Sequence, residues 1–157
     1  MTVRVVPVTD AKGAVTDEAL LRSAESVHLQ LRPQLAGRYL ERLREVFASG
    51  AEMAVAVVDG RVAGITVFRV IEKTHSGREL YCDDLVTDEA RRSTGVGHAL
   101  IDYMERICAE RGCDTFALDS GSTRQRAHRF YFREGLTISS FHFVKKISAR
   151  ETGIRKP

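Results

Sequence analysis

Two β-rich runs around the dipeptide Asp59-Gly60 restrict the fold more than any other stretch of the 157 residues. The runs are EMAVAVV, from Glu52, and RVAGITVFRV, from Arg61. Asp-Gly in a two-residue loop adopts the positive φ angles of a type I′ turn, whose twist matches that of the flanking strands. The pattern therefore predicts an antiparallel hairpin over residues 52–70.

The sequence around this hairpin alternates strand-like and helix-like segments. Strand-like runs cover residues 3–8, 79–87, 114–119 and 136–147; helical spacing of apolar residues extends from Thr16 to Pro33, Gln34 to Gly50, Gly97 to Gly112 and Arg124 to Glu134. A long helix joins the run at 79–87 to the run at 114–119, which predicts a parallel strand pair. We expect a mixed α/β fold, with a mostly antiparallel sheet flanked by helices.

Composition excludes several classes of protein. The net charge is +3, too small to indicate nucleic-acid binding, and no run approaches the roughly 18 apolar residues of a membrane span. The three cysteines have no CxxC spacing, and no cluster has the spacing of metal ligands, so we expect no metal. The length predicts one domain, residues 1–148, with a tail at 149–157. The odd number of cysteines fits a reducing cytoplasm, where we expect the protein.

The stretch DEARRSTGVGHAL, from Asp88, joins a predicted strand to a predicted helix. The first amides of a helix lack partners within the helix and carry the positive end of its dipole, so they bind anions. Glycines there let a ligand approach the backbone, while Arg91, Arg92 and the Thr94 hydroxyl add charge and a donor. Taken alone, the glycine pair is equally compatible with a tight turn that packs the helix on the strand.

Two motifs together resemble a known family. Residues 92–97, RSTGVG, match the [Q/R]-x-x-G-x-[G/A] signature of the GNAT acyltransferases, and AHRFYFREGL, from Ala127, resembles the second motif of that family. The expected element order resembles the GNAT fold over nearly the whole chain, with a parallel strand pair that splays apart.

The resemblance implies that acetyl-CoA is the acyl donor and a small primary amine the acceptor. The donor pyrophosphate would bind the amides of the signature, and its pantetheine arm would pair with the strand that ends at Thr87. The Leu85 amide would face the thioester carbonyl as an oxyanion donor. The donor-binding residues implied in this way are Leu85, Val86, Thr87, Arg92, Ser93, Thr94, Gly95, Val96, Gly97 and His98. His128, three residues before Tyr131, is a further candidate for a contact with CoA, and a surface histidine on the helix is an equal alternative.

Acetyl transfer by direct attack, through a tetrahedral intermediate, requires a neutral amine. A free alkylamine is mostly protonated at pH 7, so a general base or a chain of waters must take its proton. Asp83 and Asp84 are the candidates. They are two carboxylates in the apolar run LYCDDLV, where burying an unpaired charge would cost free energy. Adjacent strand residues point to opposite faces, so Asp83 shares a face with Tyr81, Leu85 and Thr87. The resemblance implies acidic residues near the acceptor on this face, and we therefore prefer Asp83. The alternative is that either carboxylate pairs with an arginine for structure.

Tyr131 is the candidate acid for the departing thiolate, since it matches the tyrosine of the second motif. Its alternative is a core aromatic beside Phe130 and Phe132. His28 is expected at the surface. The competing functional class is an acyl-CoA-binding sensor without acceptor chemistry, and a homodimer remains open.

Overall fold

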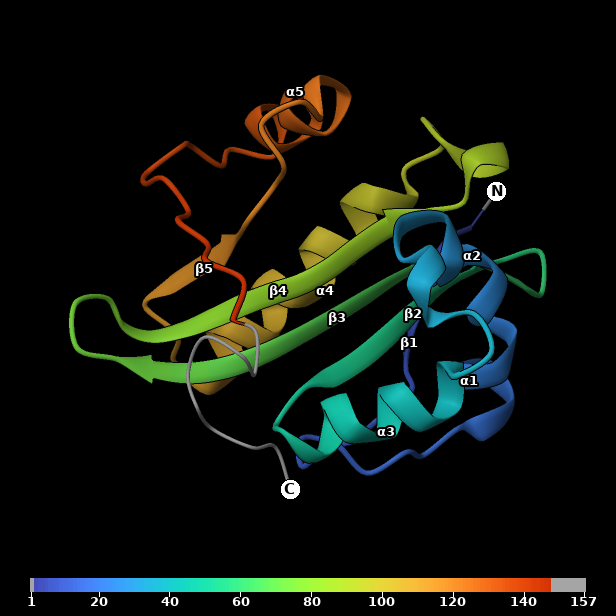
Figure 1. Ribbon diagram of the computed structural model, residues 1–157. Coiled ribbons are helices and arrows are strands. Elements are labelled where there is room, and N and C mark those ends of the chain that lie inside the picture. The colour runs from blue at the N-terminus through green and yellow to red at the C-terminus, as the bar shows by residue number, and fades with distance from the viewer. Residues whose placement is uncertain (1, 148–157) are drawn as a thin grey trace. The chain divides into compact units, whose positions relative to one another are not determined.

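The computed structural model describes residues 2–147, so the predicted tail at 149–157 lies outside the described residues. The chain divides into two compact units, residues 1–120 and 121–157. The first holds β1 (Arg4–Pro7), α1 (Glu18–Ser23), α2 (Glu25–Leu31), η1 (Pro33–Leu35), α3 (Tyr39–Ala48), β2 (Glu52–Val58), β3 (Arg61–Lys73), β4 (Gly77–Thr87), η2 (Glu89–Arg91), α4 (Val96–Arg111) and β5 (Thr115–Leu118); the second holds α5 (Gln125–Arg133) (Figure 1).

The first unit is built on one sheet with the strand order β1-β2-β3-β4-β5. Neighbouring strands are antiparallel from β1 to β4, and β5 is parallel to β4. Asp59 and Gly60 both have positive φ, 49° and 75°, between the paired residues Val58 and Arg61. The predicted hairpin, the parallel pair and the mixed sheet are thus confirmed.

The helices before the hairpin differ in detail from their prediction. The segment predicted as one helix from Thr16 forms α1 and α2, which meet at Ala24. Asp17 caps α1 by accepting a hydrogen bond from the Leu20 amide at 2.9 Å. Helix α3 begins at Tyr39 rather than near Gln34, because Pro33 begins the short turn η1 and Gly37, with a φ of 80°, separates this turn from α3.

Helices cover both faces of this sheet, with α1, α2 and α3 on one and α4 on the other (Figure 1). The larger core lies under the first three helices and includes Leu21, Leu43 and Phe47, none more than 2% exposed. On the other face α4 packs so closely that a Cβ on Gly64 would lie 2.6 Å from Val96 Cγ1. This glycine in β3 therefore determines how near the start of α4 comes to the sheet.

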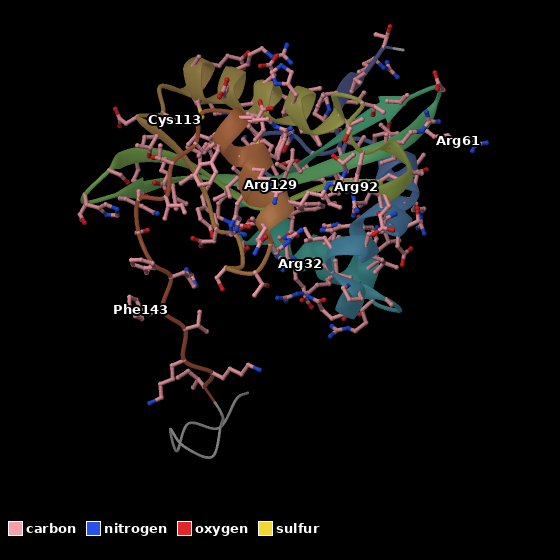
Figure 2. All side chains as sticks on the ribbon, turned by 90° about the horizontal axis from the view of Figure 1, so that it is seen from above. Arg32, Arg61, Arg92, Cys113, Arg129 and Phe143 are labelled. Atoms are coloured by element: carbon pink, nitrogen blue, oxygen red, sulfur yellow. The ribbon has the colours of Figure 1, made fainter. Side chains whose placement is uncertain are left out.

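The second unit contains no strand within residues 121–147, so the strand predicted at 136–147 is wrong. The two phenylalanines of this segment lie in solvent, with Phe141 85% and Phe143 92% exposed (Phe143 is labelled in Figure 2). Alternating apolar residues form a strand only where a neighbouring strand accepts their backbone hydrogen bonds, and here the alternation has no such partner. The single domain over residues 1–148 stays a prediction.

Candidate active site

A bulge in β4 places the two aspartates. Val67 of β3 pairs with Asp84 and the next residue, Phe68, pairs with Cys82, so Asp83 is the extra residue. An extra residue resets the alternation of side chains between the faces. Asp83 and Asp84 accordingly line one cavity. The expectation that they point to opposite faces is wrong, because it assumed a regular strand.

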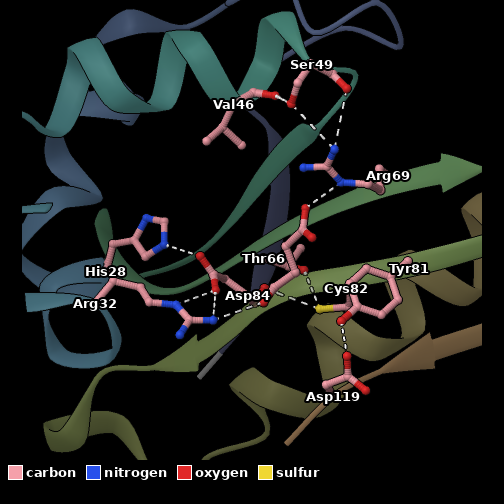
Figure 3. Close-up of polar contacts among 11 residues, drawn as sticks. His28, Arg32, Val46, Ser49, Thr66, Arg69, Tyr81, Cys82, Asp84 and Asp119 are labelled. Atoms are coloured by element: carbon pink, nitrogen blue, oxygen red, sulfur yellow. Dashed lines mark hydrogen bonds and ion pairs between the residues drawn. The ribbon is translucent and has the colours of Figure 1, made fainter. Parts of the chain in front are cut away.

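Strands β4 and β5 part at the same place. Their pairing ends with Cys82 and Leu118, while β4 continues to Thr87. Just before this point the Tyr81 hydroxyl donates a hydrogen bond to Asp119, which follows β5 (Figure 3). Residues 84–87 therefore pair with β3 on one edge, and no residue from 83 to 87 pairs with β5 on the other. The splayed pair expected from the sequence is present.

Asp84 is held by groups from and just after α2. Its carboxylate accepts hydrogen bonds from His28 Nε2 at 2.8 Å and from Arg32 Nε at 2.7 Å (Figure 3). The other ring nitrogen of His28 lies 3.2 Å from the Tyr39 hydroxyl. Burial alone would raise the pKa of Asp84, but the bonds from His28 and Arg32 outweigh it and hold the pKa below its ordinary value. Asp84 is thus kept ionised as part of a clamp.

Asp83 is in a different electrostatic environment. Its carboxylate is 2.8 Å from Arg69 Nε, and its side chain is 27% exposed against 14% for Asp84. Burial raises the pKa of Asp83, and the Arg69 guanidinium offsets only part of this. A carboxylate with a raised pKa is the stronger base, so Asp83 suits proton abstraction better than Asp84.

The cavity beside the aspartates has a volume of about 270 Å³. Its polar wall comes from α2, η1, α3 and the sheet, and its apolar wall from four aliphatic side chains. The lining residues are His28, Arg32, Gln34, Leu35, Arg42, Leu43, Val46, Val67, Arg69, Asp83 and Asp84. Such a volume is at the small end of the range for ligand pockets and favours a compact molecule.

The turn into α4 has the features expected of an anion cradle. Ser93 and Gly95 have positive φ, 63° and 85°, and no side chain caps the start of α4 at Gly95. A Cβ on Gly95 would meet nothing within 4 Å, so the space above this backbone is open. These observations fit the pyrophosphate of CoA. The positive φ also means that the fold itself requires Gly95.

Two side chains of this turn are already engaged. The Thr94 hydroxyl donates to the Arg91 carbonyl, so the donor expected there for the ligand is directed at the backbone. Arg92 forms an ion pair with Glu89 at 3.1 Å, and its guanidinium remains 41% exposed. The backbone amides of residues 92–98, more than these side chains, are the groups presented at the turn.

His128 and Tyr131 lie on α5 in the second unit. A ring nitrogen of His128 lies 2.9 Å from the Gly121 carbonyl oxygen. The Tyr131 ring is half-buried and contacts the Phe130 ring, with centroids 5.6 Å apart. The contact with CoA and the acid role assigned to these residues stay predictions.

Sequence reasoning missed His28, Arg32 and Arg69 as site residues. His28 was expected at the surface, yet its exposure is 1%. Its spacing held the signal, because His28 is four residues after Ala24, on the apolar face of the helix. Nothing local marks Arg32 or Arg69, since their partners are 52 and 14 residues away in the sequence.

Two further features concern the described residues only. Between residues 2 and 147 no group of three or more histidine, cysteine, aspartate or glutamate side chains could hold a metal ion. Among the helices of the same residues, none has the length and apolar character needed to cross a membrane.

Comparison with known proteins identifies the family. The family model described as "Acetyltransferase (GNAT) family" matches residues 18–135, which include both the cavity and the turn into α4. The chain belongs to the GNAT acetyltransferase family. It is therefore an acetyl-transferring enzyme, of a family that generally takes its acetyl group from acetyl-CoA.

Relatives of this GNAT enzyme include two bacterial proteins. An uncharacterized N-acetyltransferase of Bacillus subtilis (strain 168), YhdJ, is 32% identical over 118 residues, which cover 69% of this chain and 78% of the relative. The aminoalkylphosphonate N-acetyltransferase of Salmonella typhimurium is 25% identical over 150 residues, 91% of this chain and 94% of the relative.

Solved structures share the GNAT fold at low sequence identity. An aminoglycoside acetyltransferase from an uncultured soil metagenomic sample superposes with a TM-score of 0.75 at 16% identity, covering 93% of this chain and 97% of the other. At this identity the likeness shows the fold alone.

Proposed function

We propose that this GNAT enzyme transfers the acetyl group of acetyl-CoA to the primary amine of a small molecule. The observation that carries the proposal is the position of Asp83. It is the extra residue of the β4 bulge, it lines the cavity, and it lies where β4 leaves β5. A base, an acceptor cavity and a free strand edge thus meet at one residue.

The donor would bind along β4 and the turn that follows it. The amides of Arg92 to His98 would bind the pyrophosphate. They lie at the start of α4, where no side chain caps the helix and where the space beside Gly95 is open. The backbone of Leu85, Val86 and Thr87 would pair with the pantetheine arm, because β5 does not extend along this part of β4. His128 would supply a further contact to CoA.

The chain would contribute three groups to the chemistry. The Asp83 carboxylate would take the proton of the attacking amine, as its raised pKa favours. The Leu85 amide would donate a hydrogen bond to the oxygen of the tetrahedral intermediate. The Tyr131 hydroxyl would give a proton to the departing sulfur, so that CoA leaves as the thiol.

The size of the cavity and the relatives support a small acceptor rather than a protein. The Salmonella typhimurium relative is named for aminoalkylphosphonates, and structural neighbours are named for aminoglycosides and glucosamine-6-phosphate. Each of these is a small amine. Location in the cytoplasm and assembly as a homodimer stay predictions.

A sensor that binds acyl-CoA without acetylating anything is the second candidate, and one pair of measurements separates the two. Calorimetry with CoA tests the donor site, and a panel of small amines with acetyl-CoA tests transfer by release of free thiol. We expect CoA binding and amine-dependent release. CoA binding without transfer to any amine would favour the sensor, and absence of CoA binding would contradict both.

A further inference from the structure

The cavity lining has an excess of positive charge beside the proposed base. Three arginines, Arg32, Arg42 and Arg69, line it, against two aspartates. Both aspartates already have an arginine partner, at 2.7 Å for Asp84 and 2.8 Å for Asp83. A second cationic group on the acceptor would therefore find no carboxylate in this lining that is not already paired.

The geometry of Arg32 leaves part of its guanidinium for a ligand. Its Nε and Nη2 atoms contact Asp84, and Nη2 also donates to the Asp83 carbonyl at 3.3 Å. Within residues 2–147 the third nitrogen, Nη1, makes no such contact, and the side chain is 42% exposed. Asp84 thus holds the planar guanidinium of Arg32 at the cavity and leaves its Nη1 to donate to a ligand.

A short apolar wall completes the cavity. Leu35, Leu43, Val46 and Val67 supply aliphatic surface beside the charged groups. This arrangement fits a molecule with two polar ends and a few methylene groups between them.

Resting on the proposed function, we propose that the acceptor amine also carries an oxyanion, a carboxylate, phosphate or phosphonate, and that Arg32 binds this group while the amine lies at Asp83. Arg42 at the mouth of the cavity adds to the same field; it pairs with Glu45 at 2.7 Å and is 55% exposed. The attacking form of such a molecule, a neutral amine with an anion, can place its anion against the part of the Arg32 guanidinium that Asp84 does not use. A diamine instead brings a second cation to a lining whose two carboxylates are already paired.

A matched set of acceptors tests the charge preference. The set is 3-aminopropylphosphonate, 4-aminobutanoate, 3-amino-1-propanol and 1,3-diaminopropane, which share an amine on three methylene groups. With the full chain and acetyl-CoA, we expect kcat/KM for the two anionic members to exceed that of the alcohol at least tenfold, with the diamine lowest. Equal values for the alcohol and the anionic members would overturn the proposal.

Substitutions assign the preference to Arg32. Arg32→Gln should lower the ratio of kcat/KM for 3-aminopropylphosphonate to kcat/KM for 3-amino-1-propanol at least tenfold, and this ratio is unaffected by any loss that the broken clamp on Asp84 imposes on both acceptors. Arg42→Gln should raise the KM for 3-aminopropylphosphonate about threefold. Arg44→Gln is the matched control, because Arg44 lies on α3 but pairs with Glu18 outside the cavity. An equal loss for the anionic and neutral acceptors in Arg32→Gln would assign Arg32 to the fold instead.

A binding measurement separates failure of this inference from failure of the proposed function. In the presence of CoA, calorimetric titration should show 3-aminopropylphosphonate binding at least tenfold more tightly than 1,3-diaminopropane, and Arg32→Gln should abolish that difference. If no amine is acetylated, the proposed function fails, yet this titration still decides the anion site. Equal affinity for both probes would overturn it.

Discussion

Asp83 and Asp84 are adjacent in β4, yet their carboxylates have different electrostatic environments. Asp84 has hydrogen bonds from His28 and Arg32 and a lowered pKa, whereas Asp83 has one arginine and a raised pKa. The pairing with arginine that the sequence left as an alternative is found at both positions. It holds Asp84 as a structural anion and leaves Asp83 partly exposed at the cavity.

Replacing Asp83 tests its role as the base. We expect Asp83→Asn to lower kcat at pH 7 by about 10²–10⁴-fold, the usual contribution of general base catalysis. The loss should shrink as the pH rises toward the pKa of the amine, because the free amine then needs no base. The pH–rate profile is the measurement, with Asp102→Asn on the exposed side of α4 as the control. A loss that is the same at every pH would assign Asp83 to binding or structure.

Replacing Tyr131 tests the proposed acid. Tyr131→Phe keeps the ring and its contact with Phe130 and deletes only the hydroxyl. We expect kcat to fall by about 10²–10⁴-fold, with CoA affinity and the melting temperature near those of the wild type. The loss should be smaller with an activated thioester, whose thiol departs without a proton. Wild-type turnover of the variant would make Tyr131 a packing residue.

At the scale of elements, two features of α4 and β4 support the proposed donor site. Helix α4 begins without a side-chain cap, and β4 continues five residues beyond its pairing with β5. Gly64 allows the start of α4 to approach the sheet, so the uncapped amides lie close to the free strand edge. A turn chosen only for packing would not need both features.

A substitution at the second residue of α4 separates ligand binding from folding. In Gly97→Asp, a carboxylate would stand against the pyrophosphate, so CoA affinity should fall at least tenfold, about 1.4 kcal/mol. Stability without ligand should change little, because Asp is not a worse helix former than Gly and an acid near a helix N-terminus is favourable by about 0.3–1 kcal/mol. Calorimetry and thermal unfolding measure the two effects, and Gly97→Ala separates bulk from charge. Unchanged affinity in Gly97→Asp would contradict the cradle.

At the scale of the whole molecule, the clamp on Asp84 links α2 to the middle of the sheet. His28 is on α2 and Arg32 follows it, whereas Asp84 is 52 residues further along the chain. The clamp thus fixes one wall of the cavity against the strand that carries the proposed base. Its contribution to stability depends on the charge of Asp84.

The sign of this pH dependence follows from the lowered pKa. A carboxylate whose pKa is lower in the folded state than its unfolded value of about 3.9 stabilises the protein above that value, and the stabilisation is lost as the pH falls through the folded pKa. Asp84→Asn should therefore lower the free energy of unfolding by about 1–3 kcal/mol at pH 7. The difference in this free energy between the wild type and the variant should become smaller as the pH falls. Urea unfolding from pH 7 to pH 3 measures it.

Asp83→Asn serves as the internal comparison for this experiment. The pKa of Asp83 is raised in the folded protein, so ionisation of Asp83 lowers the stability of the wild type as the pH rises. The free energy of unfolding of the wild type should therefore fall relative to that of Asp83→Asn as the pH rises, opposite to the result for Asp84→Asn. Parallel pH profiles for the two variants would mean that the aspartates are not distinguished in this way.

The sequence by itself determined the hairpin, the parallel pair, the turn into α4 and the family, because each depends on periodicity, glycine positions or contiguous motifs. The tertiary structure alone decided the strand order and the cavity beside the aspartates. The β4 bulge, the burial of His28 and the approach of Arg32 and Arg69 to the aspartates depend on contacts between distant residues. The strand wrongly expected at 136–147 follows the same physics, since alternation predicts a strand but only a neighbouring strand can complete its hydrogen bonds.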